Sequence, residues 1–148
     1  MIFYIDEADE FSWDYLEAAP VDQTSREWGT YGDTVDGADG TAIGTGKQNT
    51  LDIIAGDTLS DKAADECADY SIENGGVTYD DWFLPSKDEL NSMYTNLHQQ
   101  GVGGFADNNY WSSSENSANN AWKQNFNNGN QNNNNKNNTN RVRAVRAF

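Results

Sequence analysis

Few residues of this chain carry the side chains on which catalysis depends. Cys67 is the single cysteine and His98 the single histidine. No basic partner that would activate Cys67 is evident, so we interpret it as a small buried apolar residue. One histidine does not allow a convincing Ser–His–Asp set, and carboxylate pairs among 24 acidic residues carry no signal. The sequence therefore predicts that the protein is not an enzyme.

Metal-binding chemistry is weakly represented as well. Asp33, Asp36 and Asp39 recur at every third position of a stretch rich in Gly and Thr. An EF-hand loop needs ligands at alternate positions and a glutamate at its twelfth position, and this pattern is absent. We therefore expect solvated turn aspartates. We interpret His98, which has no second histidine beside it, as a solvated residue rather than a metal ligand. We expect no metal and no other cofactor.

Asparagine dominates the last forty residues. The run from Asn125 to Asn140 reads NFNNGNQNNNNKNNTN, whereas only Asn49, Asn74, Asn91 and Asn96 precede position 108. Asparagine is a poor helix former and is depleted in strands, because its side chain competes for backbone hydrogen bonds. Nothing in folding physics requires such a density of asparagine.

Large apolar residues interrupt this tract. Trp111, Trp122 and Phe126 lie within or beside it, and it ends in the alternating segment RVRAVRAF. A disordered asparagine-rich tail would seldom carry two tryptophans and a phenylalanine. We predict a folded framework with asparagine at its exposed positions. The alternative is a prion-like or merely solvated polar segment.

Charge divides the chain into two parts. All 24 acidic residues but only four of the nine basic ones lie at or before Glu115, so residues 1–115 carry −20 and residues 116–148 carry +5. The acidic part argues against nucleic acid or an anionic membrane as the main partner. We expect Arg141, Arg143 and Arg146 to pair with acidic residues of the first part.

The 148 residues suit one domain. No apolar run approaches the ~20 residues of a membrane-spanning helix, so we expect no insertion into a membrane. Met1 is followed directly by a short apolar run and then by acidic residues, without the basic and apolar regions of a signal peptide.

Apolar spacing and turn residues indicate an α+β domain. Leu59, Ala63, Cys67 and Tyr70 fall on one face of a helix over 60–73, ended by Gly75–Gly76. Ser86 and Glu89 form a capping box that begins a second helix over 87–99. Short strands are expected at 2–5, 16–19, 110–111, 121–126 and 141–145, with a long loop over 20–50 and a hairpin turn at 128–129.

Several segments together resemble one family. They are WFLPSKDELNSMYTNLHQQGVGGFA (82–106), YWSSSE (110–115), AWKQNF (121–126), RVRAVRAF (141–148) and the loops WGTYG (28–32) and AIGTG (42–46). As a set, these segments resemble the variable proteins of diversity-generating retroelements, and the resemblance covers nearly the whole chain.

The resemblance implies a C-type-lectin-like fold, with two helices, short antiparallel strands and long loops in a single domain over 1–148. In that family a reverse transcriptase that misreads template adenines rewrites the C-terminal segment, here 108–148. Asparagine codons carry two adenines, so asparagine marks unmutated variable positions. The fixed framework would be Trp111, Trp122, Phe126, Gly129, Val142 and Val145. The ligand-contact positions would be Asn109, Asn116, Asn119, Asn120, Asn125, Asn127, Asn130, Asn132, Asn133, Asn134, Asn135, Asn137, Asn138 and Asn140.

The function implied by the resemblance is that of a variable receptor or adhesin. It would bind a protein or glycan ligand on a cell surface, and it would be carried by a virion, at a phage tail tip, or by a cell surface. One alternative is a calcium-dependent carbohydrate-binding lectin, although residues 116–148 hold no carboxylate side chain. Another is an enzyme of the sulfatase-modifying type, whose chemistry depends on cysteines, against the single Cys67. The sequence sets no oligomeric state.

Overall fold

The computed structural model describes residues 1–148 and contains three α-helices and ten short strands. The helices are α1 (Gly46–Gly56), α2 (Ala63–Ala68) and α3 (Lys87–Asn96), and a 3₁₀ turn, η1 (His98–Gln100), follows α3. The strands are β1 (Ile2–Ile5), β2 (Tyr15–Ala18), β3 (Gln23–Arg26), β4 (Ile72–Asn74), β5 (Val77–Tyr79), β6 (Asn109–Glu115), β7 (Asn120–Asn125), β8 (Gln131–Asn135), β9 (Asn140–Val142) and β10 (Val145–Ala147). The fold class is α+β, as predicted, but with three helices rather than two.

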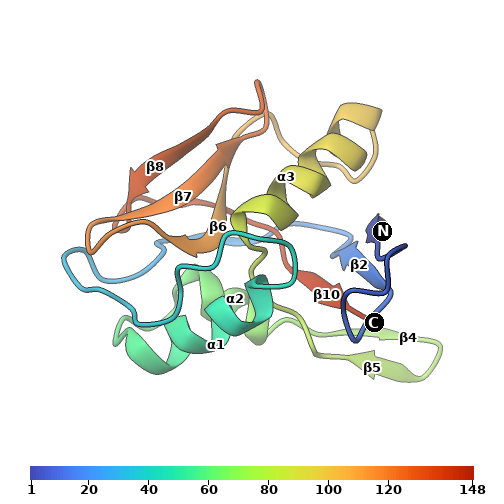
Figure 1. Cartoon of the computed structure of the whole chain (residues 1–148), viewed down its shortest axis with the longest axis horizontal. Coiled ribbons are helices and arrows are strands. Elements are labelled where there is room, and N and C mark those ends of the chain that lie inside the picture. Colours follow the sequence, from blue (N-terminus) through green and yellow to red (C-terminus); the bar gives the residue numbers. More distant parts are fainter.

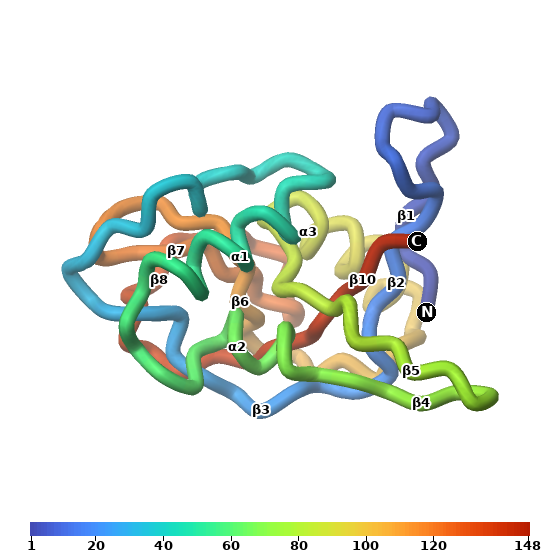
Figure 2. The backbone as a smooth tube through the Cα atoms, turned by 90° about the horizontal axis from the view of Figure 1, so that it is seen from below, coloured from blue at the N-terminus to red at the C-terminus, as the bar shows by residue number.

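The strands form two sheets and a separate hairpin. The larger sheet has the order β3-β9-β6-β7-β8, the smaller sheet has the order β1-β2-β10, and β4 pairs only with β5. In the smaller sheet β2 lies between the first and last strands of the chain, so the two termini lie close together (Figure 1). The tube in Figure 2 shows β8 and the β4–β5 hairpin at opposite ends of the molecule.

Strand β6 separates two hydrophobic clusters. Side chains alternate between the two faces of a strand, so Tyr110 and Trp111 point in opposite directions. Trp111 belongs to a cluster with Trp28, Ile53 and residues of α2. Tyr110 belongs to a second cluster with Phe126 and residues of α3. The larger sheet is therefore held on both faces along β6.

Helix α3 begins as its sequence indicates. The Ser86 hydroxyl accepts a hydrogen bond from the backbone N–H of Glu89 (3.3 Å), and the Glu89 carboxylate accepts one from the N–H of Ser86 (2.7 Å). The same carboxylate also accepts bonds from the N–H groups of Gly44 (2.8 Å) and Gly46 (3.3 Å), where α1 begins. Burial raises the pKa of Glu89 to about 7. The predicted capping box is confirmed, and it also ties α1 to α3.

The first predicted helix is wrong in extent. Helix α2 covers only 63–68 of the expected 60–73, and Gly75–Gly76 forms the turn between β4 and β5 instead of ending a helix. Both glycines have positive φ angles, of 61° and 80°, which a tight hairpin turn uses. Cys67 is nevertheless buried within α2, and burial raises the pKa of its thiol.

Two further sequence-based expectations differ from the structure. The expected loop over 20–50 contains β3 and the start of α1. The expected strand over 141–145 is two strands, because β9 ends at Val142 in the larger sheet and β10 begins at Val145 in the smaller one. The chain passes from one sheet to the other at Arg143–Ala144, where both residues are buried.

Candidate functional site

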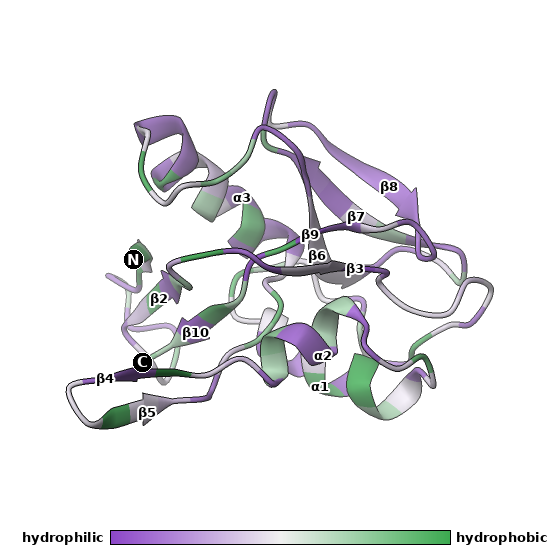
Figure 3. Ribbon diagram, turned by 180° about the vertical axis from the view of Figure 1, so that it is seen from behind, coloured by the Kyte–Doolittle hydropathy of each residue, from purple (hydrophilic) through white to green (hydrophobic).

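The asparagine tract folds into the outer part of the larger sheet. Strands β7 and β8 pair without interruption, from Asn120 opposite Asn135 to Gln124 opposite Gln131. The turn at 126–130 connects them, and Gly129 adopts a φ of 79° there. Strand β8 consists of one glutamine and four asparagines, so it is hydrophilic along its length (Figure 3).

None of the fourteen asparagines predicted as contact positions is buried. Nine are exposed, namely Asn116, Asn119, Asn127, Asn130, Asn132, Asn133, Asn135, Asn137 and Asn138. Five are partly exposed, namely Asn109, Asn120, Asn125, Asn134 and Asn140. We call these fourteen residues the amide surface. Most of it follows β7 and β8 and the turns at both ends of these strands, whereas Asn109 begins β6 and Asn140 begins β9.

Hydrogen bonds within the amide surface are local. The Asn134 side-chain oxygen accepts bonds from the Asn138 (3.1 Å) and Asn140 (3.2 Å) amides. In the β7–β8 turn, the Asn125 side chain accepts a bond from the N–H of Asn127 (2.8 Å). Asn132 and Asn133 make no side-chain hydrogen bond, so their amides are available to a ligand.

Most of the predicted framework is buried beneath these positions. Trp111 is fully buried, and its indole N–H donates to the carbonyl of Arg26 (3.0 Å). Phe126 packs on Tyr110 with 4.4 Å between ring centroids. Val142 and Val145 are also buried. These side chains hold the sheet to the body, as a fixed framework requires.

Trp122 does not follow the prediction of burial. Its side chain is only partly covered, and the Lys87 ammonium lies 3.9 Å from the centroid of its ring. Trp122 lies next to the edge of the sheet, where the start of α3 covers it incompletely. It therefore contributes apolar area beside the amide surface as well as packing.

Lys136 is a framework residue that the sequence analysis missed. Its side chain is fully buried, its ammonium donates to the Glu115 carboxylate (2.6 Å) and to the carbonyl of Asp33, and it lies 4.8 Å from the Trp28 ring centroid. Glu115 in turn accepts a bond from the N–H of Val35 (2.8 Å). Lys136 is the single charged residue between Asn125 and Asn140, which was the available signal. It anchors the end of β8 to the body.

The buried serines of β6 position the neighbouring elements. The hydroxyl of Ser112 donates to the carbonyl of Trp122 (2.7 Å), which fixes β7 where its register with β6 shifts. The hydroxyl of Ser114 donates to the carbonyl of Gly40 (2.7 Å) and accepts a bond from the N–H of Lys87 (2.9 Å). Residues 112–114 thus fasten β7, the loop before α1 and the start of α3 to one strand.

The C-terminal arginines pair with the acidic part of the chain, as predicted. Arg141 and Arg143 contact Asp22 at 3.0 and 2.6 Å, and Arg146 contacts Glu17 at 2.9 Å. Asp22 also accepts a bond from the Tyr110 hydroxyl (2.9 Å), and burial together with this carboxylate raises the pKa of Tyr110 to about 12. These pairs fix the last strands in place.

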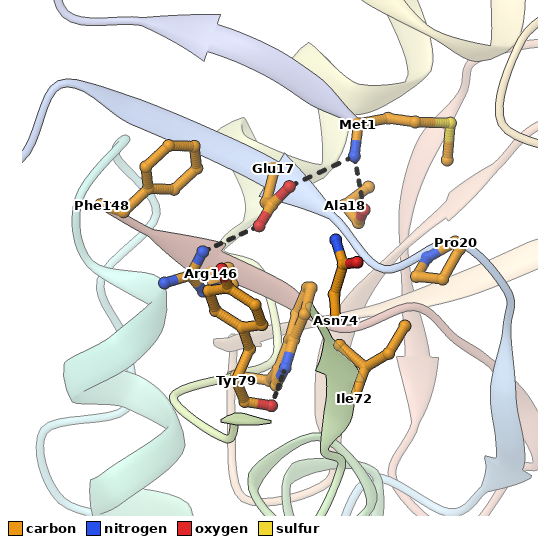
Figure 4. Close-up of a pocket in the computed structure, with 10 residues that line it drawn as sticks. Met1, Glu17, Ala18, Pro20, Ile72, Asn74, Tyr79, Arg146 and Phe148 are labelled. Atoms are coloured by element: carbon orange, nitrogen blue, oxygen red, sulfur yellow. Dashed lines mark hydrogen bonds and ion pairs between the residues drawn. The ribbon is translucent and has the colours of Figure 1, made fainter. Parts of the chain in front are cut away.

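A cavity of about 380 Å³ lies between the smaller sheet and the β4–β5 hairpin (Figure 4). Tyr79, Phe148 and Ile72 form much of its apolar wall. The charged group at its rim, Arg146, is already paired with Glu17 and with Asp81 (2.7 Å). No unpaired buried charge points into this cavity, so it is a weaker candidate than the amide surface.

Groups suited to metal binding are not brought together. The structure contains no group of three or more His, Cys, Asp and Glu side chains that could hold a metal ion. His98 is not solvated as expected, because its ring packs on Phe126 with 5.2 Å between centroids and its Nε2 lies 3.2 Å from the Asp107 carboxylate. No helix has the length and apolarity that crossing a membrane requires.

Short, mostly antiparallel strands in small sheets, joined by long loops, are consistent with a C-type-lectin-like fold, although β6 and β9 pair in parallel. The family model for the Lcl C-terminal domain matches residues 6–146, nearly the whole chain. The chain belongs to this family, the C-type-lectin-like variable-protein domain of diversity-generating retroelements. A comparison with curated proteins found no match.

Proposed function

We propose that the protein is a non-enzymatic receptor or adhesin and that the amide surface is its ligand-contact surface. The segment 108–148 is the diversified part of a single binding domain, and a virion or a cell surface displays it for attachment to a protein or glycan on another cell. The observation that supports this most is the separation of roles within one segment. Trp111, Phe126 and Lys136 are buried, whereas all fourteen asparagines reach the surface.

This separation is what a diversified surface needs. A substitution at an exposed position usually changes the free energy of unfolding by no more than about 0.5 kcal/mol. Side chains at these positions can therefore vary while the framework keeps the fold. Asparagine itself is a poor anchor for binding, because hot spots are enriched in Trp, Tyr and Arg. The protein with asparagine at these positions is expected to bind weakly, and substitution of several of these asparagines by tyrosine is expected to create affinity.

A calcium-dependent lectin is less well supported. Calcium prefers carboxylate and carbonyl oxygens, and residues 116–148 hold no carboxylate side chain. Asp33, Asp36 and Asp39 are exposed in a separate loop, and no metal-binding cluster includes them. Titration with calcium by calorimetry tests this alternative directly, and heat of binding at that loop would support it.

A display library tests the proposed function. Positions 109, 116, 120, 125, 130, 132–135, 137, 138 and 140 would be randomised, and the library would be selected against intact microbial surfaces. The matched control library would be randomised at exposed positions of α1, namely Lys47, Gln48, Leu51, Ile54 and Ala55. We expect binders from the first library and few from the second. Equal yields from the two libraries would show that the amide surface is not a specialised binding surface.

A further inference from the structure

Strand β8 is an open edge of the larger sheet. Its single neighbour is β7, and no other segment pairs with it (Figures 1 and 3). Both ends of the ladder show which groups face outward. Asn125 N–H donates to the carbonyl of Asn130 (2.9 Å), and Lys136 N–H donates to that of Asn119 (2.9 Å). Hydrogen-bonded pairs alternate along an antiparallel ladder, so Asn132 and Asn134 also bond to β7.

The intervening residues therefore present their backbone groups to solvent. The N–H groups of Gln131, Asn133 and Asn135 point away from β7, as do the carbonyls of Gln131 and Asn133. No other backbone or side-chain group bonds to them, whereas the Asn135 carbonyl accepts a bond from the N–H of Asn138 (2.9 Å). Donors and acceptors that alternate along a strand match the main chain of one further extended strand.

In the two sheets, helices contact the edge strands β1 and β3, but no element contacts the outer edge of β8. At β1, the carbonyl of Phe3 accepts bonds from Ser92 (3.3 Å) and Asn96 (2.9 Å) of α3. Directly after β3, the carbonyl of Glu27 accepts a bond from the N–H of Ala63 of α2 (2.9 Å), and the Arg26 side chain bonds to Glu66 of the same helix (2.7 Å). Natural edges are protected by charged residues, proline, bulges or covering elements. Strand β8 contains neither charge nor proline, and its register with β7 has no bulge.

The charges beside β8 select the kind of strand that would fit. Lys123 lies opposite Asn132 in the ladder, so its side chain is on the same face. Lys87 lies on the other face, over Trp122, and its carbonyl accepts a bond from the Gln131 side chain (2.8 Å). Neither lysine makes an ion pair, although the chain holds 24 acidic residues. An acidic partner complements both faces.

We propose that β8 receives an extended, acidic segment of a polypeptide ligand as an additional strand of the sheet. The proposal rests on the proposed function and specifies the partner as protein. Main-chain bonds to Asn133 and its neighbours provide attachment that does not depend on side chains, while Lys87 and Lys123 pair with acidic residues of the ligand. Attachment of this kind survives substitution of the side chains of β8. A second copy of this chain fits less well, because β8 itself holds no acidic residue with which Lys87 and Lys123 could pair.

Two substitutions at one position separate main-chain from side-chain recognition. Asn133→Pro removes an outward N–H without breaking the ladder with β7, and proline is tolerated at such edge positions. Asn133→Ala removes the amide side chain but keeps the N–H. The wild-type protein would be panned against random peptides displayed on phage, and the selected peptides would be synthesised with a fluorophore for anisotropy measurements.

We expect selected peptides rich in Asp, Glu and β-branched residues. Asn133→Pro should weaken their binding at least about tenfold more than Asn133→Ala does, because only proline removes the outward N–H; a tenfold step corresponds to ~1.4 kcal/mol. Amide exchange of the wild-type protein provides a second measurement that does not depend on the folding of a variant. The N–H groups of Asn133 and Asn135 should become protected when peptide binds.

Three outcomes would overturn the proposal. In the first, Asn133→Pro and Asn133→Ala bind the peptides equally well, and the N–H of Asn133 is not protected. In the second, the wild-type protein selects no peptide. In the third, the protein forms concentration-dependent dimers that Asn133→Pro abolishes. The third would make a second copy the occupant. If the library selection on microbial surfaces succeeds in any of these cases, the proposed function stands and only the strand-addition mode fails. If that selection fails, both fail.

Discussion

Strands β6 and β8 belong to one sheet and differ in almost every respect. Strand β6 runs through the middle, and six of its seven residues are buried. Strand β8 lies at the edge, and all five of its residues are exposed or partly exposed. Between them β7 is mixed, with Ala121 and Gln124 buried. The change from mostly buried to mostly exposed residues therefore takes place in two steps, from β6 to β7 and from β7 to β8.

The contrast shows how a segment can fold while most of its residues remain replaceable. Burial of Tyr110, Trp111 and the serines of β6 fixes the position of the sheet. Strand β8 is held by its backbone bonds to β7, by the Gln131 side chain on the Lys87 carbonyl (2.8 Å) and by the buried Lys136 at its end. Its exposed asparagine side chains are expected to contribute little to stability.

The largest expected effect is that of removing the central side chain of β6. Trp111→Ala should lower the free energy of unfolding by about 4–5 kcal/mol, at the upper end of the range for large buried aromatics, because it leaves a cavity and an unbonded Arg26 carbonyl. Denaturant unfolding measures this. A loss below ~2 kcal/mol would contradict the assignment of β6 as the fixed strand.

Breaking the anchor of β8 should have a somewhat smaller effect. Lys136→Met leaves the Glu115 carboxylate buried without its cation, and we expect a loss of about 3–4 kcal/mol in the free energy of unfolding. The double variant Lys136→Met/Glu115→Gln should recover part of this loss, because no unpaired charge remains. If the double variant is less stable than the single variant, the effect of Lys136 is not electrostatic.

The pH dependence of stability should come from the body of the protein. The pKa of Glu89 rises from 4.5 to about 7 on folding, so the folded protein binds the proton more tightly than the unfolded chain does. Its contribution to stability is complete below pH 4.5 and is lost as the pH rises to about 7, by roughly 3 kcal/mol in all.

The variant Glu89→Gln should flatten this slope, whatever its own stability. Residues 116–148 contain no Asp, Glu or His, so the charge of the amide surface stays constant over the same range. Unfolding curves at a series of pH values measure the slope. An unchanged slope in the variant would assign the pH dependence to another group.

Local signals allowed some elements to be predicted and left others hidden. Helix α3 was predictable because its capping box lies within four residues of sequence. Helix α1 was not, because it buries Asn49 and Thr50, whose partners Gly40 and Leu84 lie outside the helix. Strand β8 was not predictable, because asparagine is depleted in strands and this segment becomes a strand only through its pairing with β7.

The arrangement of the candidate site was predictable to a similar degree. The interruptions of the tract by Trp111 and Phe126 indicated a folded framework, and the asparagines around them do reach the surface. The positions of Trp122 and Lys136 could not be inferred, since both depend on residues distant in sequence. Trp122 stays partly exposed with the Lys87 ammonium over its ring, and Glu115 with the carbonyl of Asp33 makes a buried site for Lys136.

Trp122 lies between the two extremes and should show an intermediate effect. Trp122→Ala should lower the free energy of unfolding by about 1–2 kcal/mol, because the side chain is only partly buried and stacks on a single cation. Chemical denaturation alongside Trp111→Ala measures the difference. Equal losses for the two tryptophans would mean that the sheet is fixed as firmly at β7 as at β6.

The smallest expected effect is at Asn133, in the middle of β8. Its side chain is exposed and makes no hydrogen bond, so Asn133→Tyr should change the free energy of unfolding by no more than about 0.5 kcal/mol. Tyrosine also has a higher strand propensity than asparagine and lies opposite Trp122, which could offset any loss. The matched control is Gln124→Tyr on the neighbouring strand β7. The Gln124 amide is buried and bonds to Asn91 (2.8 Å), so a tyrosine side chain cannot be accommodated there. If Asn133→Tyr proves as destabilising as Gln124→Tyr, β8 is part of the fixed framework, and its asparagines are not free to vary.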